Sequence, residues 1–150
     1  MIELLNINNS NLGGVYILRF APRFFFSSLN PSNLLFKEGF DWISIRLTSE
    51  SGQVDHESAL DNGDSFYNVS ITASLPKERP EIDTVLDQYA GLPCVVNLHD
   101  QNNRERLAGH HAGELVLMHS STSGKLTADD NGYQISFKGK QQYKADFITI

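Results

Sequence analysis

The chain has 150 residues, which fits one domain that buries roughly 70% of the surface its unfolded chain would expose. Its formal net charge is -6 at pH 7, and its Lys and Arg residues form no cluster, so binding of nucleic acid through phosphate neutralisation is disfavoured. The single cysteine excludes an internal disulfide, and no apolar run reaches the roughly 18 residues of a membrane-spanning helix. We therefore expect one domain over residues 1–150, made in reducing cytosol without a signal peptide, with neither a nucleic acid nor a membrane as partner.

The N-terminal part of the chain predicts one strand followed by an unusual aromatic segment. VYILRF (15–20) has the composition of a strand. The next segment, at about residues 21–42, gathers five Phe and one Trp among Ser, Asn and Pro without regular alternation. This aromatic arm is predicted either to cover the core or to pack against a neighbouring subunit, since interfaces favour aromatic and Arg anchors. The candidate interface residues are Arg23, Phe24, Phe25, Phe26, Leu34, Leu35 and Phe36.

The middle of the chain predicts strands joined by a tight turn. DWISIRLTS (41–49) and SFYNVSITASL (65–75) alternate apolar and polar residues, which is the period of a half-buried strand. Asp-Asn-Gly occurs at residues 61–63 and again at 130–132. Neither copy has the ligand spacing of an EF-hand loop, whereas Asn-Gly suits a two-residue hairpin turn. We therefore expect turns at both places.

One segment changes its apolar period and predicts a helix. In RPEIDTVLDQYAG the apolar side chains of Ile82, Val85, Leu86 and Tyr89 recur at helical spacing. Pro80 suits the first helical position, and Gly91 suits the left-handed residue after the last turn. A short helix is therefore expected near residues 80–90.

The rest of the chain predicts further strands. These are CVVNLH (94–99), RLAGHH (106–111), GELVLMHS (113–120), GYQISFKG (132–139) and QYKADFITI (142–150), with FKGKQQY (137–143) as the turn of a final hairpin. Many strands and one helix indicate an all-β or β-rich α+β fold. We expect an antiparallel barrel or sandwich in which the helix plugs an end or crosses between strands.

No familiar catalytic or metal-binding motif is present. CxxC, HxxxH, HExxH, GxSxG and P-loop spacings are all missing. The pair His99-Asp100 offers an oriented imidazole, but a turn explains the aspartate equally well. A zinc site is imaginable only from the residues His99, His110, His111, His119 and Cys94, whose spacing fits no known ligand set. We therefore predict no catalytic, cofactor-binding or metal-binding residues, no cofactor and no enzymatic activity.

Four stretches of the sequence carry a resemblance to a group of known proteins. They are DWISIRLTSESG, NVSITASLPKERPEI, VNLHDQNNRERLAG and SGKLTADDNGYQISFKGKQQYKADFI. In these stretches the chain resembles small structural proteins of the tail or baseplate regions of phages and prophages of Bacteroidetes-type bacteria. The resemblance implies an all-β module that repeats around an axis and has no catalytic residues. His110, His111 and Ala112 depart from it, because a small hydroxyl residue and a proline are expected after Gly109.

Two functions follow as hypotheses. The first is a non-enzymatic structural subunit of a phage-tail-like or prophage-encoded assembly, whose partners are copies of itself and other phage structural proteins. Such a subunit is made in the bacterial cytoplasm and then enters a virion or phage-like particle. The second is a β-barrel module that binds a small ligand or peptide, because a strand-rich chain of this length can enclose a cavity.

Overall fold

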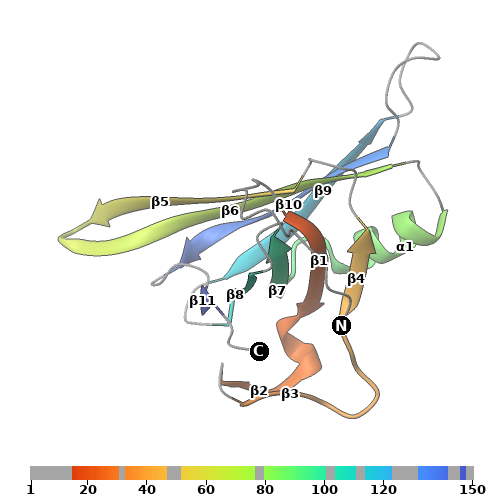
Figure 1. Cartoon of the computed structure of the whole chain (residues 1–150), viewed down its shortest axis with the longest axis horizontal. Coiled ribbons are helices and arrows are strands. Elements are labelled where there is room, and N and C mark those ends of the chain that lie inside the picture. Colours follow the sequence, from red (N-terminus) through yellow and green to blue (C-terminus); the bar gives the residue numbers. More distant parts are fainter. Residues whose placement is uncertain are drawn as a thin grey trace, which may run out of the picture.

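Antiparallel strands make up most of the chain that the structure describes, and one α-helix lies among them (Figure 1). This computed structural model describes residues 15–30, 33–46, 52–76, 80–100, 104–110, 114–122, 132–141 and 146–147. The elements are β1 (Val15–Pro22), the 3-10 turn η1 (Arg23–Phe25), β2 (Phe26–Asn30), β3 (Asn33–Phe36), β4 (Ile43–Arg46), β5 (Gln53–Asp61), β6 (Asp64–Pro76), α1 (Pro80–Tyr89), β7 (Pro93–Asp100), β8 (Glu105–Ala108), β9 (Leu115–Thr122), β10 (Gly132–Gln141) and β11 (Asp146–Phe147). The expected β-rich fold with one short helix is confirmed.

Nine of the described strands form a single sheet in the order β11-β8-β7-β9-β10-β6-β5, with β1 pairing with both β7 and β4. One edge of β7 pairs with β1, while the other edge is shared between β8 and the first residues of β9. The β5–β6 hairpin runs out from the body, and β2 and β3 form a separate two-stranded sheet at another end of the molecule (Figure 1). Within the described residues the sheet does not close into a barrel, because β4 and β5 each pair with one strand only.

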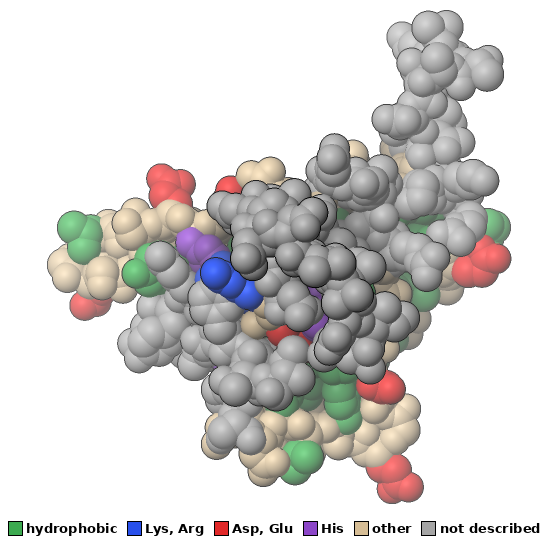
Figure 2. Space-filling view, viewed as in Figure 1, with side chains coloured by type: hydrophobic (Ala, Val, Ile, Leu, Met, Phe, Trp, Pro, Cys, Tyr) green, Lys and Arg blue, Asp and Glu red, His purple; other side chains and the backbone are tan. Residues whose placement is uncertain are grey.

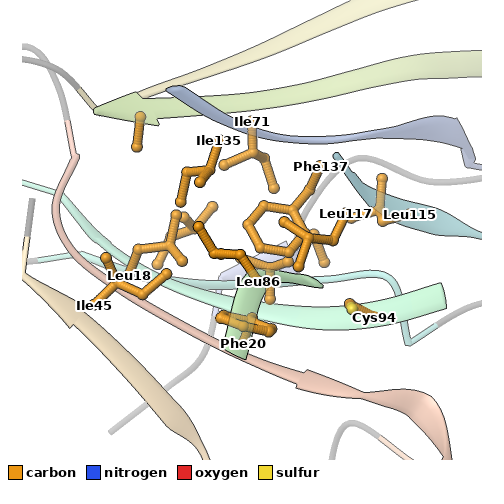
Figure 3. Packing of buried hydrophobic residues seen from close by; sticks show 14 of the residues in the cluster. Leu18, Phe20, Ile45, Ile71, Leu86, Cys94, Leu115, Leu117, Ile135 and Phe137 are labelled. Carbon is orange, nitrogen blue, oxygen red and sulfur yellow. The ribbon is translucent and has the colours of Figure 1, made fainter. Parts of the chain in front are cut away.

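The sheet curls around its main core. Phe20 on β1 and Phe137 on β10 are three strands apart in the sheet, which would separate them by roughly 14 Å if the sheet were flat. Their ring centroids are 5.4 Å apart, so the sheet bends until its two parts face each other. Leu86 of α1 enters the space between these parts, where it lies among the side chains of β1, β4 and β10 (Figure 3). The interior at this place is therefore filled by side chains.

A second, smaller core lies on the other face of β7. Residues of β7 alternate between the two cores: Cys94 and Val96 belong to the main core, and Val95 belongs to the second. Ala21, Leu107 and the arm residues Phe25 and Phe26 complete the buried part of the second core. Most of β7 is therefore covered on both faces, which explains its nearly continuous apolar sequence.

The helix α1 begins and ends as the sequence predicts. It starts at Pro80, and Thr84 Oγ1 donates a hydrogen bond to the Pro80 carbonyl at 2.9 Å. After Tyr89 the chain reaches Gly91, which has a φ of 81°. The Gly91 N–H then donates to the carbonyl of Leu117 at 2.8 Å, so the end of the helix is joined to β9.

The first Asp-Asn-Gly is a hairpin turn, as expected. Asp61 and Asp64 are paired residues of β5 and β6, and only Asn62 and Gly63 lie between them. Both have positive φ angles, 51° and 87°, which is the conformation of a type I′ turn. The second copy begins outside the described residues, which resume at Gly132 at the start of β10.

Two parts of the strand pattern differ from the prediction. No strand is predicted from the sequence at β5, β2 or β3, and all three segments are strands. The predicted turn at FKGKQQY is wrong over residues 137–141, which continue β10. Gly139 lies there because the backbone of Glu114 passes against it, and a Cβ at this position would overlap the Glu114 carbonyl oxygen.

Candidate functional site

The candidate interface residues all lie in the aromatic arm at residues 21–42. The arm has an inner side, which packs against the second core, and an outer side. On the inner side, Phe26 and Phe36 stack with centroids 4.4 Å apart and an interplanar angle of 27°. Trp42 contacts both rings edge-on, with its ring centroid 5.5 Å from that of Phe26 and 5.3 Å from that of Phe36. These side chains pack against the second core, so the inner side of the arm is fixed to β7 and β8.

The arm also exposes large apolar side chains to solvent. Phe25 is buried. Its ring centroid lies 4.5 Å from that of Phe40 and 5.0 Å from that of Phe24. Phe24 is 52% exposed, Leu35 49% and Phe40 40%. These three side chains are called the arm surface below. Apolar side chains are visible at this end of the molecule in Figure 2.

The seven candidate interface residues are therefore divided by the fold. Phe25 and Phe26 are buried inside the chain, so their contact with a neighbour would require the arm to open. Phe24 and Leu35 are exposed and accessible to a neighbour. The remaining three, Arg23, Leu34 and Phe36, are partly buried. Phe40 is an exposed apolar residue that the sequence analysis did not include.

The histidines and the cysteine do not form one site among the described residues, and no group of three possible metal ligands occurs there. Cys94 lies in the main core, where burial raises the pKa of its thiol to about 12. His110 is buried after β8, and His119 Nε2 lies 3.1 Å from Asp87 Oδ1 of α1. His111 lies outside the described residues.

His99 belongs to a buried polar cluster that the sequence analysis missed. Its Nε2 lies 3.3 Å from Oε2 of Glu105, and Asn97 Nδ2 donates to Oε1 of the same carboxylate at 2.7 Å. His99 and Glu105 are paired residues of β7 and β8, so their side chains lie on one face of the sheet. The carboxylate of Glu105 therefore reaches His99 from the neighbouring strand. The signal for this pair is the strand register, which the spacing of the residues in sequence does not reveal.

The chemistry of this cluster fits a structural role. His99 and Asn97 are both buried, so the described surroundings close the imidazole to a substrate. One carboxylate accepts from Asn97 and faces His99, which links β7 to β8 at two neighbouring positions. We assign the cluster to fixing the register of these two strands.

Two acidic side chains on α1 attach the helix to the sheet. Tyr133 Oη donates to Asp83 Oδ1 at 2.8 Å, one helical turn before the contact of Asp87 with His119. Tyr133 and His119 lie on the neighbouring strands β10 and β9. These contacts hold α1 across the sheet and bring Leu86 into the core.

Comparison with known proteins gives no relative: no protein-family model, curated protein or solved structure matches this chain. Within the described residues, no helix has the length and apolar character needed to cross a membrane.

Proposed function

We propose that this chain is a non-enzymatic structural subunit of a phage-tail-like or prophage-encoded assembly, and that the arm surface makes its contacts with neighbouring subunits. The observation that carries the proposal is the place of the exposed apolar side chains. Of the five large hydrophobic residues exposed in the described chain, Phe24, Leu35 and Phe40 all lie on the arm. Exposed apolar residues gathered at one place favour a protein contact over solvent.

The phage part of the proposal is supported by the sequence resemblance, which spans four stretches of the chain. The β-rich fold agrees with the kind of module that this resemblance implies. The partners are then copies of the chain and other phage structural proteins, and the final location is the virion or phage-like particle.

The second hypothesis is a module that binds a small ligand or peptide inside a barrel. The described interior is occupied by large side chains such as Phe137, Tyr133 and Leu86. A ligand in this place would have to displace packed apolar groups, which costs several kcal/mol by order of magnitude. The packing therefore favours the structural subunit.

The test is the association of the purified full chain. We expect wild-type protein to form oligomers as its concentration rises, measured by sedimentation velocity. The double variant Phe24→Ser and Phe40→Ser removes two exposed rings and should shift the protein to monomer with little change in melting temperature. The matched control is Met118→Ser on β9, because Met118 is 56% exposed and lies in a different sheet from β2 and β3.

Met118→Ser is expected to leave association unchanged. Oligomers that persist in the arm variant, or that are lost equally in the Met118 variant, would remove the arm surface from the proposal.

A further inference from the structure

The free edges of the described strands differ in how they are protected against pairing with another chain. Free strand edges are templates for pairing, and natural proteins block them with charges, bulges or short lengths. Within the described chain, five strands have an edge without a strand partner: β2, β3, β4, β5 and β11.

Charge protects β5, the longest of these strands. Asp55 and Glu57 on one of its faces are exposed, and the strand contains no Lys or Arg. Two copies paired along this edge would bring carboxylates together, which is unfavourable. The β5 edge is therefore unsuited to self-association, although Leu60 near its tip is 77% exposed.

The other four edges differ in regularity and in charge. β2 has an irregular register between Phe26 and Ser28, so its residues do not present a regular ladder. Only two residues of β11 are described, and β4 contains a charged residue, Arg46. β3 (Asn33–Phe36) contains no charged residue, and the extra residue of the irregular pairing lies on β2 between Phe26 and Ser28, so β3 itself has no bulge.

We propose that β3 pairs edge to edge with β3 of a second copy of this chain, forming a four-stranded sheet from two β2–β3 hairpins. This inference rests on the proposed function and specifies the contact. A second copy fits because residues 24–36 contain no charged side chain, although the chain carries a formal net charge of -6. Antiparallel self-pairing of this strand about a two-fold axis can place Leu35 opposite Leu35 of the second copy and brings no like charges together within β3.

The size of the arm surface supports backbone pairing over side-chain contact alone. An aromatic side chain buries about 150–250 Å², so three half-exposed side chains supply on the order of 300 Å² per subunit. A stable interface needs roughly 800 Å² from each partner. Main-chain hydrogen bonds between two β3 strands supply affinity that the side chains alone lack.

The first experiment adds a protecting charge to the edge of β3. Leu35→Lys should weaken dimer formation at least about tenfold in sedimentation equilibrium, because two lysines would meet near the paired strands. Leu60→Lys is the matched control, since it makes the same change at an exposed leucine of the protected β5 edge. Leu60→Lys should leave the dimer constant unchanged, and both variants should keep the wild-type melting temperature.

The second experiment measures hydrogen exchange at the backbone amides of residues 34–36 in wild-type protein. We expect slower exchange in the dimer than in dilute monomer, because strand pairing protects outward-facing amides. If the chain stays monomeric at high concentration, or if Leu35→Lys dimerises as wild type does, the inference is overturned. Association that depends on Phe24 and Phe40 without added protection in β3 would also overturn it, while leaving the proposed function in place.

Discussion

Cys94 lies inside the main core, where its Sγ donates a hydrogen bond to the Leu92 carbonyl at 3.4 Å. A thiolate here would lose its hydration, and this desolvation raises the pKa of the thiol from 9.0 to about 12. The thiol therefore stays protonated at neutral pH and acts as a small hydrophobic group.

The raised pKa has a measurable effect on stability. Between pH 9.0 and about 12 the folded chain keeps the Cys94 proton while the unfolded chain loses it, so the stability contributed by Cys94 falls as pH rises. Cys94→Ala removes this dependence. We expect the difference in the free energy of unfolding between wild type and variant to be constant below pH 9. Above pH 9, wild type should lose stability relative to the variant by at most about 1.4 kcal/mol per pH unit. Urea unfolding at stepped pH measures it, and a constant difference up to pH 11 would contradict the burial.

In the arm, the sequence does not predict which of the aromatic residues are exposed. Phe24, Phe25 and Phe26 are identical in type and consecutive, yet Phe24 is exposed and the next two are buried. A regular strand would turn neighbouring residues to opposite faces, but the 3-10 turn η1 ends at Phe25 and breaks this alternation. Because apolar sequence alone does not locate such a turn, the prediction named all three as interface residues.

At the scale of elements, the close approach of the Glu114 backbone to β10 constrains Gly139. A Cβ there would overlap the Glu114 carbonyl oxygen, so Gly139→Ala forces the start of β9 to shift. We expect this substitution to lower the free energy of unfolding by about 3 kcal/mol, as in overpacked cores. Gly63→Ala is the control, since its Cβ meets no atom within 4 Å and its cost is the positive φ alone, about 1 kcal/mol. Equal losses for the two variants in urea unfolding would contradict the close approach.

The elements that were predicted correctly have a clear apolar period. β6 alternates over its length and α1 repeats its apolar residues at helical spacing, because each buries one face against the main core. β5 was missed because most of its residues on both faces are polar, although the Asn-Gly turn after it implies a strand partner for β6. The turn predicted around Gly139 was wrong because the glycine is required by a close contact with the backbone of Glu114, just before β9, and not by a turn.

At the scale of the whole molecule, the fold combines a packed body with two hairpins at different ends, β5–β6 and β2–β3 (Figure 1). The body is held by the curled sheet, by α1 and by the second core, which together bury the apolar faces of the chain. The β5–β6 hairpin carries acidic, exposed residues, while the β2–β3 hairpin carries the uncharged strand edge and three exposed or partly buried candidate residues, Leu34, Leu35 and Phe36 (Figure 1). The two ends therefore differ in charge, which suits a subunit that contacts neighbours at one end and meets solvent at the other.

The most direct measurement of the central claim is the protein content of phage-like particles from the bacterium that encodes this chain. Particles released after induction are purified by density gradient, and the chain is quantified by mass spectrometry against the other particle proteins. The account predicts that the chain sediments with the particles in many copies and stays bound through high-salt washing, because the arm contact is apolar and salt does not screen it. A chain that is abundant in the cell but absent from the particle fraction would contradict the account.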